Sequence, residues 1–201
     1  MKKIGLFGGT FNPIHLGHMK IAKTFYEKLH LDEMIVMPAK VPVHKESKGL
    51  APAADRLEMC RIAIKDIPHF SVSDFELNSD KPSYTVYTLR EFEKHNKDAK
   101  FYLIIGSDML FTLDEWFLYE EILQRAVVCA AARLEGDRRQ LERYKSYYEE
   151  KGGQVEIVDM PPLAISSMEI RGMIARGEDA GAYLDPRVLD YIRQRGLYQV
   201  G

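Results

Sequence analysis

Short runs of apolar residues recur along the chain and predict buried β-strands. The first run, Ile4-Gly5-Leu6-Phe7, ends in a glycine turn, and the second, Met34-Ile35-Val36-Met37, is closed by Pro38. The strongest signal is Phe101-Tyr102-Leu103-Ile104-Ile105. Apolar and polar residues alternate over 70–75, as in a strand with one exposed face, and two further apolar runs occupy 126–131 and 155–158.

Helical spacing fills the intervals between the predicted strands. Ala22, Phe25, Tyr26 and Leu29 recur at i, i+3, i+4 and i+7 and form one apolar stripe, while neighbouring charged residues can face water. Helical patterns also occur at 55–64, 84–92 and 137–151, and in most of the chain after the last strand. Strands that alternate with helices in this way predict an α/β fold.

The expected architecture is a Rossmann-like open parallel sheet with helices on both faces and a small C-terminal helical segment. A length of 201 residues fits one domain, so we expect a single domain over 1–201, with 166–201 as its C-terminal helical portion. Ligands of such sheets bind beyond the carboxyl ends of the strands. Functional residues are therefore expected directly after the strands.

Composition and charge narrow the range of ligands and locations. Lysine and arginine total 28 against 30 aspartates and glutamates, so no broad basic surface for nucleic acid is expected. No apolar run approaches the ~18 residues that a membrane span needs, and the first run is too short for a signal peptide. Cys60 and Cys129 have neither CxxC spacing nor histidine partners, so no disulfide framework or zinc site is expected. A reduced cytoplasm is the expected location, and the sequence leaves open whether the chain forms a homo-oligomer.

The glycine turn after the first strand carries the first candidate site. Gly8 and Gly9 let backbone N–H groups approach a phosphate, and the following helix, for which Asn12-Pro13 offers an N-cap, adds the positive end of its dipole. His15 and His18 lie three residues apart, hence on nearly one helical face. A glycine turn alone is as often structural as functional, and one histidine at a helix start is more often a cap or a solvated side chain. Their combination at the end of a strand predicts an anion site.

The segment from Gly8 to His18 does not match the common phosphate-binding motifs, but it resembles a motif of a known superfamily. It lacks the G-x-G-x-x-G fingerprint, and no P-loop occurs in the chain. Residues His15-Leu16-Gly17-His18 are similar to the (T/H)-x-G-H motif of the nucleotidylyltransferase superfamily. The longer form, GGTFxPIHxGH, resembles the bacterial nicotinate-nucleotide adenylyltransferases. Further motifs follow in the order of that family, from about residue 4 to 193.

Two of these motifs resemble ATP-binding segments. Gly106-Ser107-Asp108 ends the strongest strand, although Asp108 could instead cap the next helix. In Ile165-Ser166-Ser167-Met168-Glu169-Ile170-Arg171, similar to ISSTxIR, Ser166 and Glu169 show a capping-box pattern that would bring N–H groups, hydroxyls and Arg171 together around a phosphate. The resemblance implies an ATP site formed by Gly8, Gly9, Thr10, Phe11, His18, Gly106, Ser107, Asp108, Ile165, Ser166, Ser167 and Arg171.

Other motifs resemble the part of the family's site that binds the second substrate. Pro42-Val43-His44-Lys45 implies that Lys45 meets substrate phosphates, where the alternative is a solvated loop lysine. Pro82-Ser83-Tyr84-Thr85 implies that Thr85 lies near a nicotinate ring, while Ser83 could serve as a helix N-cap. Trp116, the only tryptophan, is implied to stack on that ring beside Phe117, and packing in the core is the alternative.

Four positions depart from the family pattern. Asn12 stands where aspartate is common, Met168 replaces the threonine of ISST, and Phe117 occupies a position that is often tyrosine. The segment around Arg133 lacks the Arg-Pro-Gly of many members. Phe117 and the segment around Arg133 affect the expected shape of the pyridine and adenine pockets, and none of the four departures removes a charged catalytic group.

The resemblance implies an enzyme that transfers the adenylyl group of ATP to nicotinate mononucleotide, forming nicotinate adenine dinucleotide (deamido-NAD) and pyrophosphate in NAD biosynthesis. His15, His18, Lys45 and Arg171 would be the catalytic residues, and Mg²⁺ would arrive on the ATP phosphates without a metal site in the protein. Two alternatives stay open. The same fold could use another acceptor, such as phosphopantetheine or nicotinamide mononucleotide, or it could serve as a nucleotide sensor without catalysis, which the intact His15, His18, Lys45 and Arg171 disfavour.

Overall fold

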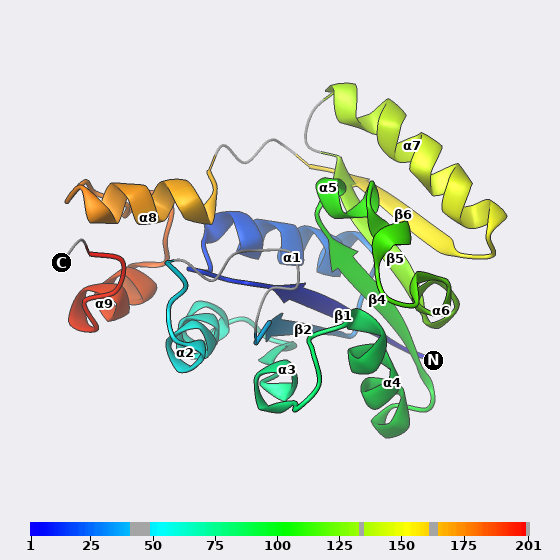
Figure 1. Ribbon diagram of the computed structural model, residues 1–201, viewed down its shortest axis with the longest axis horizontal. Coiled ribbons are helices and arrows are strands. Elements are labelled where there is room, and N and C mark those ends of the chain that lie inside the picture. Colours follow the sequence, from blue (N-terminus) through cyan, green and yellow to red (C-terminus); the bar gives the residue numbers. More distant parts are fainter. Residues whose placement is uncertain (41–48, 133–134, 161–164, 200–201) are drawn as a thin grey trace.

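A parallel β-sheet forms the centre of the molecule. The computed structural model describes residues 1–40, 49–132, 135–160 and 165–199. Six strands in this part of the chain follow the order β3-β2-β1-β4-β5-β6, and every neighbouring pair is parallel (Figure 1). They are β1 (Lys2–Gly9), β2 (Glu33–Pro38), β3 (Phe70–Val72), β4 (Ala99–Ile105), β5 (Ala126–Ala132) and β6 (Gln154–Asp159).

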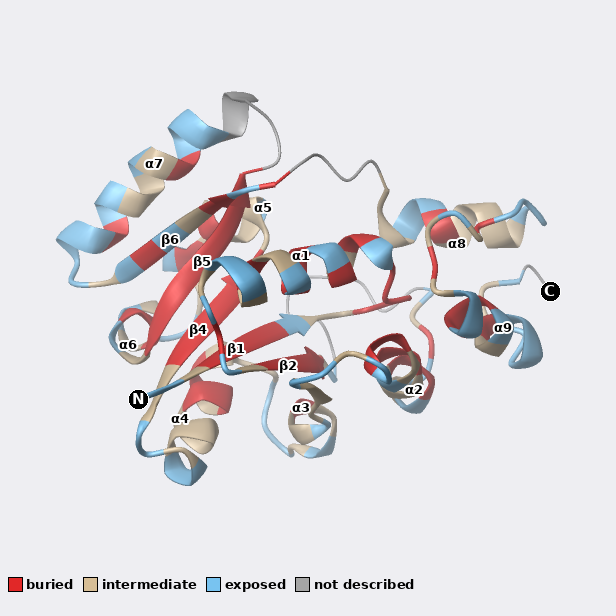
Figure 2. Cartoon of the chain, turned by 180° about the vertical axis from the view of Figure 1, so that it is seen from behind, coloured by how far each residue is buried: buried red, intermediate tan, exposed pale blue. Residues whose placement is uncertain are grey.

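The predicted apolar runs coincide with these strands because a parallel sheet is covered on both faces. All seven residues of β5 are buried, and the central strands are buried along most of their length (Figure 2). The alternating segment 70–75 is a strand only as far as Val72. There the Oγ of Ser73 accepts a hydrogen bond from the Phe75 N–H at 3.2 Å, and a short helix begins, so the last part of that strand prediction is wrong.

Helices cover both faces of the sheet. Alternate residues of β4 separate two apolar clusters: Tyr102 and Ile104 belong to one, Phe101 and Leu103 to the other. Helices α1, α2, α8 and α9 contribute to the first cluster, and α4, α5, α6 and α7 to the second. The helices are α1 (Leu16–Lys28), α2 (Ala53–Ile64), α3 (Phe75–Asn78), α4 (Thr85–His95), α5 (Ser107–Leu110), the 3₁₀ turn η1 (Leu113–Glu115), α6 (Tyr119–Arg125), α7 (Glu135–Glu150), α8 (Ser167–Ala175) and α9 (Pro186–Gln194).

The strand order places a topological switch point between β1 and β4. The chain leaves β1 through α1 toward β2, and it leaves β4 through α5 and α6 toward β5, on the opposite side. Connections that diverge in this way open a crevice at the carboxyl ends of the two strands. Gly8 and Gly9, predicted as a turn, are instead the last residues of β1, and they are thereby brought beside Gly106 after β4. The Rossmann-like fold expected from the sequence is confirmed, and its ligand crevice lies where the two motifs meet.

Helices α8 and α9 lie beyond the carboxyl end of β1, and α9 packs beside α2 (Figure 1). Arg56, in α2, is fully buried, and burial lowers its pKa. Its guanidinium donates hydrogen bonds to the carbonyl oxygens of Thr10 at 2.8 Å, Ala51 at 3.2 Å and Lys40 at 3.3 Å. Arg56 therefore ties the turn after β1 to the segments after β2.

Replacing Arg56 should cost much of the stability of this corner of the fold. Arg56→Ala would leave three carbonyl groups without their charged donor, and we expect a loss of at least about 3 kcal/mol, because hydrogen bonds to charged groups contribute about 1.5 to 3 kcal/mol each. Urea unfolding measures this loss. Arg61→Ala, at an exposed position of the same helix, is the matched control and should change stability by less than about 0.5 kcal/mol. Equal midpoints for the two variants would contradict the assigned role.

Candidate active site

Two cavities meet at the carboxyl ends of β1 and β4. The first has a volume of about 640 Å³ and the second about 490 Å³. Their linings share residues from the two strand ends: Gly8, Gly9, Thr10, Ile105, Gly106 and Met109. A molecule in one cavity can therefore touch a molecule in the other across the switch point.

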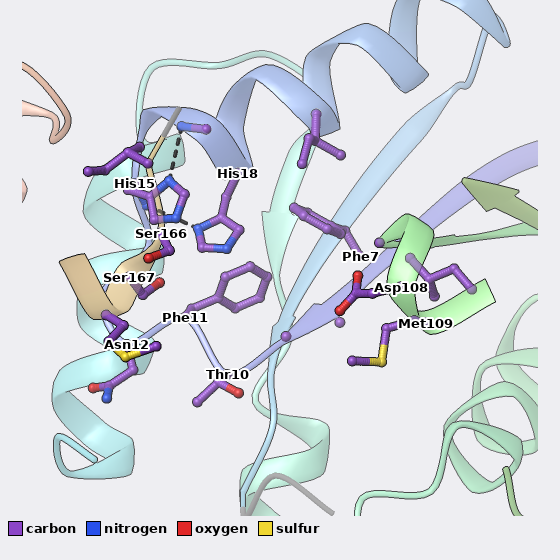
Figure 3. Close-up of a pocket in the computed structure, with 18 of the residues that line it drawn as sticks. Phe7, Thr10, Phe11, Asn12, His15, His18, Asp108, Met109, Ser166 and Ser167 are labelled. Carbon is purple, nitrogen blue, oxygen red and sulfur yellow. Dashed lines mark hydrogen bonds between the residues drawn. The ribbon is translucent and has the colours of Figure 1, made fainter. Parts of the chain in front are cut away.

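The first cavity collects the predicted ATP residues from three separate segments. The turn after β1 and the start of α1 form one wall, and the start of α8 adds Ser166 and Ser167 beside it (Figure 3). Asp108 and Met109 of α5 lie on the opposite side of the cavity. Every residue of the predicted ATP set lines this cavity except Ser107, the first residue of α5. The lining also includes His15, which the sequence assigned to catalysis, and Asn12, Gly17 and Met168.

His15 and His18 form the N-terminal cap of α1. His15 is the N-cap residue, its Nδ1 accepts the Gly17 N–H at 3.1 Å, and the Nδ1 of His18 accepts the His15 N–H at 3.3 Å (Figure 3). The spacing of three residues is thus that of a capping box, with imidazoles in place of the usual side chains. Because each Nδ1 accepts, the neutral rings carry their protons on Nε2. The rings lie 3.7 Å apart between centroids, and two donors are placed together.

The ring of Phe11 packs against the imidazole of His18. The backbone of Phe11 has a φ of 46°, which costs about 1 kcal/mol in a residue with a side chain, yet its ring is only 2% exposed. The ring meets His18 edge-on at 5.1 Å and Phe7 at 5.4 Å. Burial of an aromatic ring offsets the backbone cost. A Cβ on Gly9 would lie 3.0 Å from this ring, whereas one on Gly8 would meet no atom within 4 Å, so Gly8 leaves the space open to a ligand.

Asn12 is not the helix cap that the sequence suggested. Its side chain, 5% exposed, instead joins distant segments: Oδ1 accepts from the Ala51 N–H at 3.0 Å and from the Tyr198 hydroxyl at 2.8 Å, and Nδ2 donates to the Gly49 carbonyl at 2.9 Å. His15 takes the cap because the chain turns at 12–14 before α1 begins. The role of Asn12 depends on partners 37 to 186 residues away.

The predicted capping box of α8 is present. The Ser166 N–H donates to Glu169 Oε2 at 2.7 Å, the Ser166 Oγ accepts from the Glu169 N–H at 3.2 Å, and the hydrogen bonds from Ser166 lower the pKa of Glu169. Ser167 and Arg171 reach the turn after β1, where they donate to the Pro13 carbonyl at 3.0 Å and to the Asn12 carbonyl at 2.8 Å. The amide groups, hydroxyls and guanidinium expected around a phosphate are therefore brought to the first cavity.

The second cavity contains the predicted residues of the second substrate. Thr85, Trp116 and Phe117 all line it. Trp116 also packs against the second apolar cluster, so the predicted alternatives, stacking and core packing, are both compatible with its place. Phe117 is 43% exposed and stacks on Tyr84 with ring centroids 4.8 Å apart. Ser83 is not the N-cap of α4: Tyr84 occupies that position without a side-chain cap, and the Ser83 Oγ accepts from the Lys40 N–H at 3.2 Å.

Glu76 is a lining residue of this cavity that sequence reasoning missed. It is 8% exposed, and the Thr88 hydroxyl donates to its Oε1 at 2.8 Å. Burial raises its pKa, and the hydrogen bond from Thr88 opposes that change to a lesser degree. No local signal marks Glu76, because its place depends on a partner twelve residues away, Thr88 of α4.

Some expectations fall outside the described residues. Lys45 and its motif lie in 41–48, and Arg133 lies in 133–134. Within the ranges given above, no three His, Cys, Asp or Glu side chains gather where they could hold a metal ion. Nor does any helix in those ranges have the length and apolarity to cross a membrane.

Comparisons with known proteins agree with this geometry. Residues 6–173 match the family model described as cytidylyltransferase-like. A probable nicotinate-nucleotide adenylyltransferase of Lachnoclostridium phytofermentans is 38% identical over 98% of this chain and 100% of its own length. The protein of the same name from Clostridium acetobutylicum is 39% identical with the same coverage.

Solved structures show the same fold at lower identity. The Plasmodium falciparum nicotinic acid mononucleotide adenylyltransferase complexed with NaAD superposes with a TM-score of 0.77, with 21% identity and 98% of each chain covered. A putative nicotinate-nucleotide adenylyltransferase from Vibrio parahaemolyticus gives a TM-score of 0.70 at 24% identity over 100% of this chain and 98% of that one. With the family model and the full-length relatives, this likeness leads to one conclusion: the chain belongs to the cytidylyltransferase-like family and, within it, to the nicotinate-nucleotide adenylyltransferases.

Proposed function

We propose that this chain transfers the adenylyl group of ATP to nicotinate mononucleotide, releasing pyrophosphate and forming nicotinate adenine dinucleotide for NAD biosynthesis. The observation that carries the proposal is the pair of joined cavities at the switch point, one lined by phosphate-binding groups and the other by aromatic rings and a helix start. The name of the full-length relatives and the NaAD bound to the Plasmodium falciparum enzyme support this assignment of substrates.

The reaction needs positive charge and alignment more than proton transfer. A phosphate oxygen of nicotinate mononucleotide attacks the α-phosphorus of ATP, a new P–O bond forms, and the bond from the α-phosphorus to the bridging oxygen breaks, so that pyrophosphate leaves. The attacking phosphate is already an anion at neutral pH, and a general base is not required. Catalysis then comes from holding the two phosphates in line and from donors placed where negative charge develops.

We assign the donors of the first cavity to the triphosphate. The Nε2 atoms of His15 and His18 would donate to the α- and β-phosphates, while Arg171, Ser166 and Ser167 would hold the leaving pyrophosphate. Lys45 is proposed to meet the attacking phosphate. Mg²⁺ bound by the ATP phosphates would neutralise part of their charge, and Asp108, a carboxylate in the lining of this cavity, is compatible with a cation carried there by the nucleotide.

The second cavity is proposed to hold the pyridine ring. Trp116 would stack on the ring, and Thr85 begins α4, whose first N–H groups and positive dipole end favour a carboxylate over a neutral amide. We further propose that 1–201 is a single domain with 166–201 as its helical portion, because α8 and α9 pack in the same apolar cluster as the sheet. We also propose that the enzyme acts in the cytoplasm.

His18→Ala should lower kcat by roughly 10²- to 10³-fold, the usual effect of removing one preorganised donor. Pyrophosphate release from ATP, Mg²⁺ and nicotinate mononucleotide measures it. Because His18 also caps α1, His18→Glu serves as a stability control: glutamate at this position restores a capping box without restoring the donor. We expect normal thermal stability and low turnover. Turnover near that of the unmodified enzyme in either folded variant would refute the role. His95→Ala, exposed on α4, should leave kcat unchanged.

Trp116 should report directly on the second cavity, since it is the only tryptophan of the chain. Saturating nicotinate mononucleotide should quench or shift its fluorescence, and Trp116→Ala should weaken that substrate more than ATP, because ring stacking is lost. Trp116→Phe keeps an aromatic surface and should retain an intermediate affinity. An unchanged spectrum, together with a Trp116→Ala protein that loses only thermal stability, would assign Trp116 to the core alone.

The enzyme should recognise its acceptor by the carboxylate of nicotinate mononucleotide, which nicotinamide mononucleotide lacks. Hydrogen bonds to a charged group contribute about 1.5 to 3 kcal/mol, so kcat/KM for nicotinate mononucleotide should exceed that for nicotinamide mononucleotide by roughly tenfold to a hundredfold. Both acceptors, and phosphopantetheine, are compared at equal ATP and Mg²⁺ by pyrophosphate release. Thr85→Val keeps the shape of the side chain and should narrow the ratio. Equal kcat/KM values for the two mononucleotides would refute the acceptor while leaving adenylyl transfer intact.

A further inference from the structure

A tyrosine far from both cavities in sequence touches the turn that lines the first one. The hydroxyl of Tyr198 donates to Asn12 Oδ1 at 2.8 Å, across 186 positions of the chain. Asn12 itself lines the cavity. This hydrogen bond joins the segment after α9 to the turn after β1.

The backbone of Tyr198 is held in an unfavourable conformation. Its φ is 65°, in the left-handed region that residues with a side chain rarely adopt. Such a conformation persists where surrounding contacts determine it, and it is concentrated at sites where precise placement matters. Leu197 and Tyr198 both pack against the first apolar cluster, so burial and the hydrogen bond to Asn12 together fix this residue.

Asn12 passes this constraint on to the phosphate-binding side chains. Oδ1 accepts two hydrogen bonds and Nδ2 donates one, so both ends of the amide are engaged, and an aspartate could not donate to the Gly49 carbonyl. The main-chain carbonyl of the same residue accepts from Arg171 Nη1 at 2.8 Å. A change in the orientation of Asn12 would therefore move the acceptor that aims the guanidinium of Arg171.

Electrostatics at Tyr198 favour a neutral hydroxyl that donates. Burial raises its pKa, and the nearby guanidinium groups of Arg171 and Arg56 lower it to a lesser degree, while Asp55 and Cys60 raise it. The groups that face the hydroxyl thus come from α2 and α8 as well as from the turn. The Tyr198 hydroxyl is therefore expected to keep its proton, and the hydrogen bond to Asn12, near neutral pH.

We infer that Tyr198 is a positioning residue for ATP: through Asn12 it fixes the turn after β1 and the direction of Arg171. The inference depends on the proposed function only for the identity of ATP as the ligand of the first cavity. It predicts an effect on ATP and on turnover with ATP, and none on the affinity for the acceptor in the second cavity.

Tyr198→Phe tests this inference by removing one hydroxyl while keeping the ring. The Kd of a non-hydrolysable ATP analogue with Mg²⁺, measured by calorimetry without acceptor, and the KM for ATP should both rise about three- to tenfold, the range that one neutral hydrogen bond contributes. The KM for nicotinate mononucleotide should stay within about twofold. Tyr191→Phe is the matched control, because the Tyr191 hydroxyl donates to Asp55 at 2.8 Å and ties α9 to α2 without reaching the turn.

A double-mutant cycle separates positioning from a structural role. In an Arg171→Ala background, Tyr198→Phe should cause no further loss of ATP affinity, since the two residues act on the same contact. Additive losses, unchanged ATP affinity in Tyr198→Phe, or an equal loss in Tyr191→Phe would each overturn the inference. If the unmodified protein binds the ATP analogue but forms no dinucleotide, the proposed function fails, while the effect of Tyr198 on the Kd is still measured.

Discussion

Hydrogen bonds to the carbonyl groups of one four-residue turn organise this molecule. Thr10, Asn12 and Pro13 present their carbonyl oxygens to Arg56, Arg171 and Ser167 respectively. In a trans peptide the C=O and the next N–H point in opposite directions, so holding the Thr10 carbonyl against Arg56 directs the Phe11 N–H to the other side. The donors come from α2 and α8, so both helices hold the turn in place.

The same turn connects the fold to the chemistry. A parallel sheet with a switch point creates a crevice whatever its sequence, but a crevice alone does not bind a triphosphate. Here the cap of α1 is built from imidazoles, and the cap of α8 from a serine and a glutamate, so the structural need to satisfy the first N–H groups of two helices also places donors around the cavity. The residues that begin these helices are thus the residues proposed to bind phosphate.

Strain and burial are concentrated at the same place. Phe11 and Tyr198 both have positive φ; the buried ring of Phe11 contacts His18, and the partly buried Tyr198 donates a hydrogen bond to Asn12. The arginine that supports the turn from the opposite side is itself fully buried among carbonyl oxygens. These arrangements cost free energy locally, and the two apolar clusters on the faces of the sheet offset that cost.

Interactions between residues close in sequence determined many of the helices, strands and helix caps, so the sequence alone predicted them. Apolar runs, helical periodicity and the capping box at Ser166 depend on residues within about four positions of each other, and most of these features were found where the sequence predicted them. The exceptions are the end of the 70–75 segment, which is not a strand, and Gly8 and Gly9, which belong to β1 itself. Motif spacing and family resemblance also named many of the residues that line the two cavities in the described part of the chain, although Glu76 was missed.

Tertiary structure decided what depends on distant partners. Asn12 has the local features of a helix cap, yet its side chain bonds to Gly49, Ala51 and Tyr198, and His15 caps the helix instead. Glu76 and Ser83 likewise have distant partners, Thr88 of α4 and the Lys40 N–H respectively. Sequence patterns do not reveal hydrogen bonds of this kind, because the partners are brought together by packing and not by spacing along the chain.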